Sequence, residues 1–488
     1  MKGCTVAETL QGLKPALVWK YFYEISRIPR PSKHEEKMTA YVLATAKKLG
    51  LEARKDAAGN VIAHKPGSKG RERAPMIALQ GHLDMVAEKN ANKVHDFMKD
   101  PLELVRKGNV LMANGTTLGA DNGIAVATNL AIMEDRSLEH GPLEFLFTVD
   151  EETGLTGANS LKPGFVRSTT LLNLDSEEEG AIYVGCSGGR DTLARWKTAT
   201  DPAPAGSAVL ELSVKGLKGG HSGLEIDKNR GNALKILNRV LLRLPDARVA
   251  AMDGGNKRNA IPREAVALIC VPKKRVAEIK KLVAGMNATI RAEVASVEPD
   301  LKIGASLAKN QKGARVWKKA LQRSVCAAIS ALPHGVVKMS SDIPGLVETS
   351  TNVAVMTTSP KEIFLGTSQR SSVSSELDEI QDTVAMIAEL ASAKVERTDG
   401  YPGWKPNLDS PILKLARSTY KKLYGKEVEV KAIHAGLECG IIGEKYHGMD
   451  MISFGPTMEG VHSPDEKLYI DTVERFYKFL LATLKNAS

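Results

Sequence analysis

The chain has 488 residues, and at this length about two or three domains are expected rather than one compact core. Hydrophobic residues make up 43% and charged residues 25%, as in an ordinary globular protein, and no apolar run reaches the roughly 18 residues of a membrane span, so no membrane partner is expected. The net charge of +10 comes from dispersed Lys and Arg mixed with acids, and aromatic residues are only 5%, so nucleic acid is not expected as a partner.

The five cysteines are scattered and lack the spacing of a zinc ribbon or a CxxC motif. A disulfide framework is therefore not expected, and a reducing, cytoplasmic setting fits best. Residues 1–20 contain no continuous apolar segment, so we expect no secretory signal there.

The first part of the chain predicts helices over residues 16–26 and 33–49, followed by a hairpin over residues 52–63. An amphipathic helix is predicted over residues 123–134. Apolar strands are predicted over residues 76–80, 143–149 and 170–174. Each strand is followed by a His or acidic residue, at the sheet edge where α/β proteins bind ligands. We therefore expect an α/β fold with a mostly parallel central sheet and helices on both faces.

From about residue 189 the pattern changes to alternating strands and amphipathic helices. Strands are predicted over residues 208–214 and 266–271, and helices over residues 229–244, 275–286 and 374–393. The pattern predicts an inserted α+β domain over residues 189–399, made of two similar units, 189–295 and 296–399. After a predicted hinge over residues 399–404 come a helix, 411–424, and a strand, 451–454. The first domain would therefore be discontinuous, 1–188 and 400–488.

Five separated segments carry His and carboxylate side chains: residues 81–84, 119–123, 150–154, 173–175 and 460–463. Each has an ordinary interpretation when taken alone. His82-x-Asp84 could be structural, Asp121 could cap the helix that follows it, and residues 150–152 could form a solvated acidic turn. Adjacent carboxylates are unfavourable unless cations neutralise them. In this order, and mostly just beyond apolar strands, the five segments predict one dinuclear metal site.

These segments resemble those of the dinuclear zinc aminopeptidase, carboxypeptidase and aminoacylase superfamily, and more narrowly its aminoacyl-histidine (Xaa-His) dipeptidase branch. The narrower resemblance covers essentially the whole chain. It rests on residues 80–86, 118–125, 150–158, 174–189, 216–232, 258–265, 345–354, 433–440 and 455–465. The resemblance implies a zinc-peptidase catalytic domain with the inserted α+β domain as a lid.

The resemblance also implies two divalent metal ions, with Zn expected and Mn or Co as alternatives that carboxylate-rich sites accept. Asp121 would bridge the two ions, and its peptide bond to Asn122 would be cis. The ligands implied are His82, Asp121 and Asp175 for one ion, and Asp121, Glu152 and His462 for the other.

The remaining site residues receive roles in hydrolysis from the same resemblance. Asp84 would orient His82, and Glu151 would take a proton from the attacking water and pass it to the leaving amine. His221 would stabilise the oxyanion, in its own chain or in a partner's; a turn histidine is the alternative. The residues expected to bind substrate are Asn259, Arg370, His434 and Gly436, and an exposed surface arginine is the alternative for Arg370.

We therefore expect a cytoplasmic, metal-dependent dipeptidase that cleaves Xaa-His or a broad range of small dipeptides. An N-acyl amino acid amidohydrolase on the same scaffold stays an alternative. A non-catalytic binding protein is the third reading, although the intact Glu151 and ligand set argue against it. A homodimer stays open, because a duplicated lid could mimic a dimer within one chain.

Overall fold

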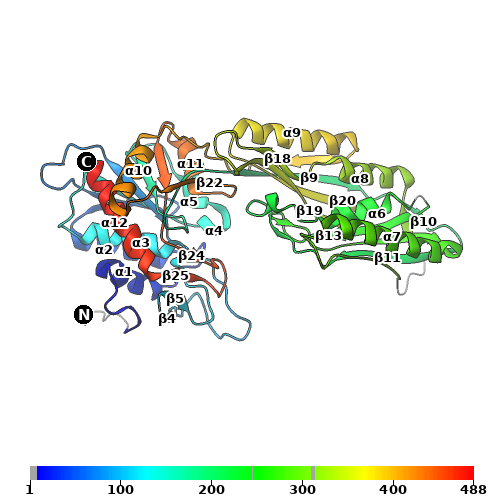
Figure 1. Cartoon of the computed structure of the whole chain (residues 1–488), viewed down its shortest axis with the longest axis horizontal. Helices are drawn as coiled ribbons and strands as arrows, with labels where there is room; N and C mark the ends of the chain where they lie inside the picture. The colour runs from blue at the N-terminus through cyan, green and yellow to red at the C-terminus, as the bar shows by residue number, and fades with distance from the viewer. Residues whose placement is uncertain (1–7, 245, 309–313) are drawn as a thin grey trace. The chain divides into compact units, whose positions relative to one another are not determined.

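The computed structural model describes residues 8–244, 246–308 and 314–488, which form two compact units (Figure 1). Unit 1 comprises Met1–Gly185, Pro406–Ala432 and Leu437–Ser488, and unit 2 comprises Cys186–Lys405 and Ile433–Gly436. The predicted boundaries, 188/189 and 399/400, lie a few residues from these. Within the described ranges, no helix has both the length and the apolar character needed to cross a bilayer.

The described part of unit 1 contains an eight-stranded sheet with the order β1-β2-β6-β3-β7-β23-β8-β22. Its centre is parallel, as predicted: β6 pairs with β3, β3 with β7 and β7 with β23. The pairs β1–β2, β2–β6 and β23–β8 are antiparallel, so the whole sheet is mixed. The strands are β1 (Glu52–Lys55), β2 (Val61–Lys65), β3 (Ile77–His82), β6 (Leu143–Thr148), β7 (Thr170–Asn173), β8 (Ala181–Cys186), β22 (Glu429–Ile433) and β23 (Asp450–Ser453).

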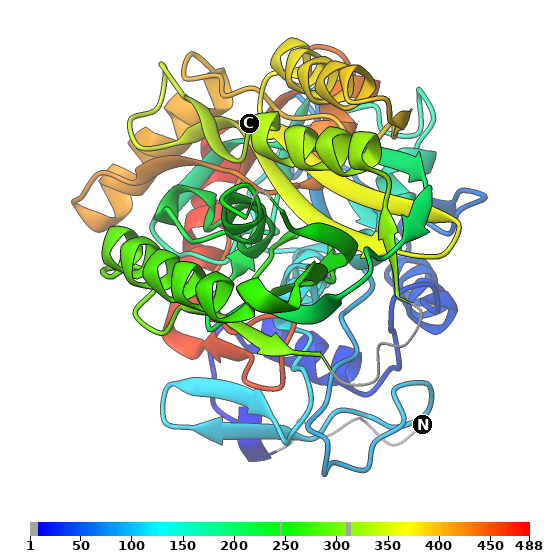
Figure 2. The ribbon, with the colours of Figure 1, turned by 90° about the vertical axis from the view of Figure 1, so that its right-hand side faces the viewer.

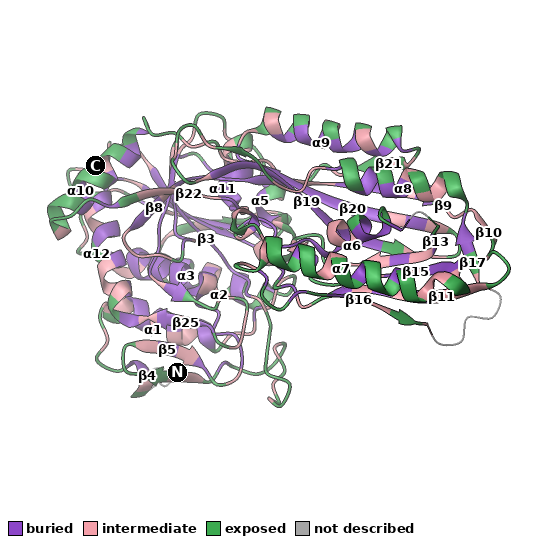
Figure 3. Ribbon diagram, turned by 45° about the vertical axis from the view of Figure 1, so that its right-hand side comes forward, coloured by how far each residue is buried: buried purple, intermediate pink, exposed green. Residues whose placement is uncertain are grey.

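Both faces of this sheet are covered, because every residue of β3 and β6 is buried although successive side chains point to opposite faces (Figure 3). Helix α1 packs on α3, and α10 packs on α12 and β23. The helices are α1 (Ala16–Ser26), α2 (Glu36–Leu49), α3 (Ala120–Glu134), α4 (Glu151–Gly154), α5 (Thr156–Ser160), α10 (Pro411–Tyr424), α11 (Glu438–Lys445) and α12 (Ile470–Asn486).

A smaller antiparallel sheet of unit 1 joins distant parts of the chain in the order β24-β25-β5-β4. Its strands are β4 (Leu104–Lys107), β5 (Val110–Ala113), β24 (Met458–Glu459) and β25 (Lys467–Tyr469). The segment that carries His462 connects β24 to β25, so this sheet anchors it at both ends.

Unit 2 is built on a sheet whose described strands run in the order β16-β11-β15-β13-β19-β20-β9-β21, with β18 (Gly335–Met339) also paired to β19. The first repeat of the unit is β11 (Ser207–Lys215), α6 (Ala233–Leu241), β13 (Arg248–Gly254), β15 (Ala265–Pro272), α7 (Val276–Val294) and β16 (Lys302–Leu307). The second repeat is β9 (Gly188–Lys197), α8 (Lys319–Ala331), β19 (Val347–Thr358), β20 (Glu362–Ser371), α9 (Ser374–Leu390) and β21 (Lys394–Arg397).

Both repeats have the order β-α-β-β-α-β, and in both the fourth strand lies beside the first, followed by the third and the second. In Figure 2 the first repeat is green, whereas the second repeat begins with blue-green β9 and continues from α8 in yellow-green and yellow. The repeats are nested, however, and not in tandem at 295/296 as expected from the sequence. Because β9 pairs with β20 and β21, the first repeat is inserted between β9 and α8 of the second.

Two short ladders complete unit 2. β10 (Thr200–Pro202) pairs with β17 (Arg315–Trp317), at the points where the chain enters and leaves the inserted repeat. β12 (Gly220–His221) pairs with β14 (Ala260–Ile261), which places His221 opposite Ala260.

Candidate metal centre

Three parallel strands of unit 1 bring their predicted site residues to one sheet edge. β3 ends at His82, β6 is followed by residues 149–152, and β7 is followed by Leu174 and Asp175. The strands are in register, with His82 opposite Thr148 and Gln80 opposite Asn173. Asp121 lies at the start of α3, where its backbone angles are not helical, and His462 lies in the β24–β25 connection.

The five predicted ligands form two groups that share Asp121. His82, Asp121 and Asp175 offer ligand atoms that all lie within 4.8 Å of one another, and Asp121, Glu152 and His462 do the same. Oδ1 of Asp121 lies 3.1 Å from Nε2 of His82, while Oδ2 lies 3.1 Å from Nε2 of His462. Each oxygen of this carboxylate therefore faces a different histidine, and the Asp121–Asn122 peptide bond is cis, as the resemblance implied.

The other two carboxylates complete these groups. Oδ1 of Asp175 lies 3.3 Å from Nε2 of His82, and Oε2 of Glu152 lies 2.9 Å from Nε2 of His462. Oδ1 of Asp175 and Oε1 of Glu152 are buried and accept no hydrogen bond from any described residue. Buried carboxylates this close together are unfavourable without a cation between them. Imidazole and carboxylate donors suit Zn²⁺ and also Mn²⁺ or Co²⁺, so the residues fit two divalent ions.

Asp84 holds His82 in the orientation that a metal ligand needs. Its Oδ1 lies 3.2 Å from Nδ1 of His82, so Nε2 is left to face Asp121. Asp84 also accepts hydrogen bonds from the backbone amides of Glu151, at 3.0 Å, and Glu152, at 3.2 Å. Burial opposes its ionisation, but His82, together with hydrogen bonds from the Glu151 amide and the Ser32 hydroxyl, lowers the pKa of Asp84 to about 2. Asp84 thus acts as a fixed anion that ties β3 to the segment after β6.

Glu151 lies beside the ligands and belongs to neither of the two groups that share Asp121. One of its oxygens is within 4.8 Å of ligand atoms of His82 and Glu152. Burial is the largest influence on its pKa, and together with the charges of Asp175 and Glu152 it raises the pKa of Glu151 well above the usual range, although His82 lowers it. A carboxylate with a raised affinity for a proton is suited to general-base chemistry.

A buried row of polar side chains lies under the ligands, and sequence reasoning missed it. Gln80 Nε2 donates to Glu438 Oε2 at 2.6 Å, Thr148 Oγ1 donates to the same oxygen at 2.6 Å, and Asn173 Nδ2 donates to Gln80 Oε1. Burial raises the pKa of Glu438 to about 7. Gln80 and Asn173 stand two residues before His82 and Asp175, and Thr148 is paired with His82, so the three side chains lie on one face of the sheet. Polar residues within otherwise apolar strands were the signal that could have revealed this row.

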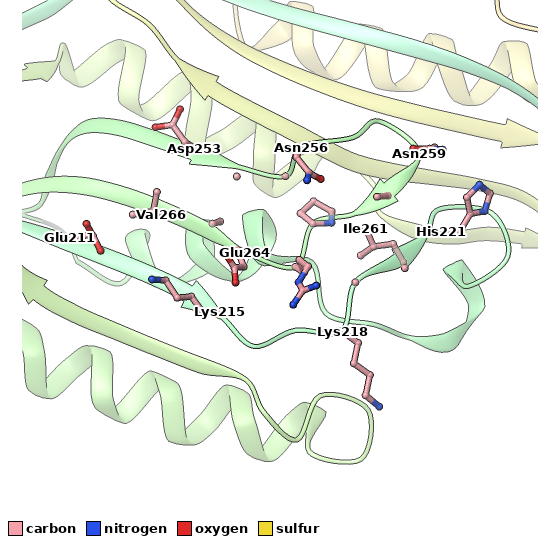
Figure 4. A pocket seen from close by; sticks show the side chains of 18 residues that line it. Glu211, Lys215, Lys218, His221, Asp253, Asn256, Asn259, Ile261, Glu264 and Val266 are labelled. Atoms are coloured by element: carbon pink, nitrogen blue, oxygen red, sulfur yellow. The ribbon is translucent and has the colours of Figure 1, made fainter. Parts of the chain in front are cut away.

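In unit 2, His221 and Asn259 line a cavity of about 880 Å³ (Figure 4). Nδ1 of His221 accepts hydrogen bonds from the backbone amides of Gly223, at 3.2 Å, and Leu224, at 3.1 Å. In a neutral imidazole the proton is then on Nε2, which makes Nε2 a donor. Asn259 precedes β14, the strand paired with the strand of His221, and its backbone carbonyl accepts from Ser222 N at 2.9 Å.

Unit 2 also brings Arg370, His434 and Gly436 together, although the sequence placed the latter two in the discontinuous catalytic domain. Residues 433–436 belong to unit 2, and Ser187 N of that unit donates to the carbonyls of residues 433 and 435. Arg370 Nη1 donates to Tyr401 Oη at 2.9 Å, and a Cβ on Gly436 would lie 2.8 Å from the Tyr401 ring.

The alternative of an exposed surface arginine is wrong, since Arg370 is only 7% exposed. His434 Nε2 lies 2.7 Å from Ser350 Oγ. Burial, followed by the charge of Arg370, lowers the pKa of His434 to about 3, so this imidazole is neutral at physiological pH.

Comparison with known proteins gives a family and a close structural relative. The model of the peptidase family M20/M25/M40 matches residues 78–486. The cytosol non-specific dipeptidase of Escherichia coli (strain K12) is 41% identical over 479 residues, which cover 98% of each chain.

The crystal structure of aminoacylhistidine dipeptidase from Vibrio alginolyticus superposes with a TM-score of 0.89 at 41% identity, covering 98% of this chain and 97% of that one. Aminopeptidase PepT from Bacillus cereus ATCC 10987 shares the fold, with a TM-score of 0.56 at 16% identity over 97% of this chain and 99% of that one. With a family match and a relative that both extend over most of its length, the chain belongs to peptidase family M20/M25/M40.

Proposed function

We propose that this chain hydrolyses the peptide bond of dipeptides with two divalent metal ions, of which zinc is the expected metal. The observation that carries the proposal is the pair of donor groups that share Asp121, with Glu151 beside them. Its support is the likeness over nearly the whole chain to proteins named as dipeptidases. The proposed ligands are His82, Asp121, Glu152, Asp175 and His462.

When bound, such ions polarise a water molecule and the scissile carbonyl group. The protein side chains supply the remaining steps. Asp84 fixes the ring of His82, so that Nε2 stays directed at the ligand cluster. The Glu151 carboxylate accepts a proton from the attacking water and then delivers it to the nitrogen of the leaving amine, which balances the reaction. Burial of Asp84 and His82 excludes bulk water from the back of the site.

We propose that unit 2 serves as the lid and supplies the groups that bind substrate. His221, with its donor on Nε2, is suited to stabilise the oxyanion. Arg370 is suited to the free carboxylate of a dipeptide, because a buried guanidinium forms strong bidentate contacts. Asn259, His434 and Gly436 complete the proposed set. In this proposal His221 acts either on the site of its own chain or on that of a homodimer partner.

The proposed substrates are dipeptides in a broad range that includes Xaa-His. The Escherichia coli relative is named as non-specific and the Vibrio alginolyticus structure as an aminoacylhistidine dipeptidase. The word cytosol in the first of these names supports a proposed cytoplasmic location. An N-acyl amino acid amidohydrolase remains the second candidate on this scaffold.

A substrate panel tests this proposal. The protein loaded with Zn²⁺, Mn²⁺ or Co²⁺ is assayed on carnosine, on Gly-Leu and on N-acetyl amino acids. Release of free amino acids from the dipeptides, with little from the acetylated compounds, is the expected result. Preference for the acetylated compounds would instead favour the amidohydrolase, and no turnover of any amide with two metals bound would reject both.

The role of Glu151 can be tested apart from metal binding. Glu151→Gln keeps the shape of the side chain but removes the proton acceptor, so turnover should fall at least about 100-fold. Metal content measured by elemental analysis should stay at the wild-type value, because Glu151 is outside the two proposed ligand sets. Near-normal turnover in this variant would show that another group is the base.

A further inference from the structure

The turn that presents Asp121 rests against a buried carboxylate from the far end of the chain. Glu466 is 2% exposed. Its Oε2 accepts hydrogen bonds from Leu118 N at 2.7 Å and Gly119 N at 3.0 Å, and its Oε1 accepts from Ala120 N at 2.8 Å and Asp121 N at 3.3 Å. One side chain thus satisfies four consecutive backbone amides that lead into the shared ligand.

A buried guanidinium also binds this turn, through a carbonyl. Arg30 is 2% exposed, and its Nη2 donates to the carbonyl oxygen of Gly119. Its Nη1 donates to the carbonyls of Leu83, at 3.0 Å, and Asp84, at 2.5 Å. Arg30 therefore ties the turn to the residues that directly follow His82.

The close approach of this guanidinium requires glycine at two positions. A Cβ on Gly119, whose φ is +65°, would lie 2.7 Å from Nη2 of Arg30. A Cβ on Gly123 would lie 2.6 Å from the same nitrogen. The Gly-rich turn therefore has a packing reason as well as a conformational one.

Glu466 and Arg30, which we call the two anchors of this turn, are each linked to one of the two histidines that face Asp121. Glu466 stands four residues after His462, in the same β24–β25 connection. Arg30 holds the backbone that follows His82. The two oxygens of Asp121 face these two histidines. The position of one carboxylate relative to both histidines therefore depends on two oppositely charged side chains that do not belong to the proposed ligand set.

We propose that Arg30 and Glu466 are positioning residues that fix the backbone of residues 118–121, so that Asp121 serves both metal ions at once. The inference rests on the proposed role of Asp121 as the shared ligand. Because both ions share that carboxylate, loss of either anchor weakens the binding of both metal equivalents. Loss of a ligand that belongs to only one donor group weakens mainly the binding of one equivalent.

Glu466→Gln tests the first anchor. The amide side chain keeps one acceptor oxygen but turns an N–H donor toward backbone amides that are themselves donors. We expect Zn²⁺ affinity to fall about 10–100-fold for both equivalents, as is typical when a partner of a ligand is lost. Affinity is measured by competition with a chromophoric chelator, and the absorption spectrum of the Co²⁺-loaded protein reports changed ligand geometry without reference to turnover.

Glu144→Gln is the matched control. Glu144 is also fully buried in unit 1 and accepts from the backbone amides of Arg167 and Ser168, at 2.9 and 2.8 Å for its Oε2. Its hydrogen-bond and ion-pair partners are Arg167, Ser168 and His64 rather than residues 118–121, so the variant should lose stability while both metal affinities and the Co²⁺ spectrum stay unchanged. An equal loss of metal affinity in this control would overturn the proposal, because the effect would then be general destabilisation.

Arg30→Lys is the second variant and does not depend on Glu466. A single ammonium group keeps the charge but cannot reach the carbonyls of Leu83, Asp84 and Gly119 together. The same weakening of both equivalents is expected. Wild-type affinities and spectra in both variants would overturn the proposal even if wild-type protein hydrolyses dipeptides. Failure of wild-type protein to hydrolyse dipeptides would reject the proposed function, while weakened metal binding in both variants would still support this inference.

Discussion

The side chain of His462 is much more exposed to solvent than that of His82, the other histidine that faces Asp121. The His462 side chain is 51% exposed, whereas that of His82 is 1% exposed and fixed by Asp84. The donor group that contains His462 is therefore the more accessible of the two. A substitution there should act on one ion before it affects the whole site.

His462→Ala should lower the metal content of the protein by about one equivalent after dialysis, because a zinc site with only two protein ligands binds weakly. Elemental analysis measures this directly. His447→Ala is the control, since His447 is also exposed, lies in unit 1 and is outside the candidate site. Two equivalents retained by His462→Ala would remove this residue from the ligand set.

The site residues that the sequence predicted differ from Arg30 and Glu466, which it did not predict, in the groups that they bind. His82, Asp121 and Asp175 follow apolar strands or sit in a Gly-rich turn, so short motifs reveal them. Arg30 and Glu466 instead bind backbone carbonyls and amides, which every residue carries. No pairing pattern in the sequence points to such partners, and only the folded backbone shows them.

At the scale of elements, α6 depends on the side chain that precedes it. The sequence predicted a helix over residues 229–244, but α6 begins at Ala233, because Asn232 caps it. Asn232 Oδ1 accepts from Leu234 N and Lys235 N, at 3.0 and 3.1 Å. Its Nδ2 donates to Val353 O at 2.8 Å and lies 3.3 Å from Nδ1 of His334.

This cap predicts a pH dependence of stability through His334. Burial, followed by the charge of Lys235, lowers the pKa of His334 from 6.5 to about 4. The unfolded chain therefore binds a proton at a higher pH than the folded one, so the contribution of His334 is complete above its unfolded pKa and is lost as pH falls from 6.5 toward 4. Protonation also removes the acceptor that faces Asn232.

His334→Gln should therefore reduce the difference in urea unfolding midpoint between about pH 7.5 and about pH 5. Urea unfolding followed by circular dichroism at the two pH values measures the effect. The exposed His447→Gln variant should leave the difference as it is in wild type. An unchanged pH dependence in His334→Gln would show that this imidazole titrates normally in the folded state.

Strand positions were largely predictable, but strand partners were not. Residues 143–149 and 170–174 were predicted as strands from their apolar runs, and β6 and β7 lie within those ranges. The pairing of β9 with β20, such as Thr192 opposite Thr367, joins segments separated by the entire inserted repeat. A local pattern carries no information on such a partner, which is why the repeats were expected in tandem.

At the scale of the whole molecule, the metal ions should contribute to stability. Without them, Asp121, Glu152 and Asp175 lie close together as buried carboxylates, an arrangement that a bound cation relieves. Ions that bind only the folded protein stabilise it by about 4 kcal/mol at a free concentration near 1,000 times Kd. A chelator should therefore lower the unfolding temperature, and added Zn²⁺ should restore it.

Differential scanning calorimetry with EDTA and with excess Zn²⁺ measures this shift. Asp121→Asn is the comparison variant, because it weakens both donor groups and should respond to Zn²⁺ much less than wild type does. An unfolding temperature of wild-type protein that is the same with chelator and with metal would contradict the proposed centre.

The ladder between β10 and β17 has an implication for how unit 2 could be shortened. Pro202 and Arg315 are directly opposite each other in it, so a direct join between them would delete the inner repeat and leave the outer one topologically complete. The deletion would nevertheless expose apolar side chains of the outer repeat. Val353 and Leu365 of that repeat belong to one hydrophobic cluster with Leu212 and Ile269 of the inner repeat. The chain connections would therefore allow the inner repeat to be deleted, but the hydrophobic core that the two repeats share would not.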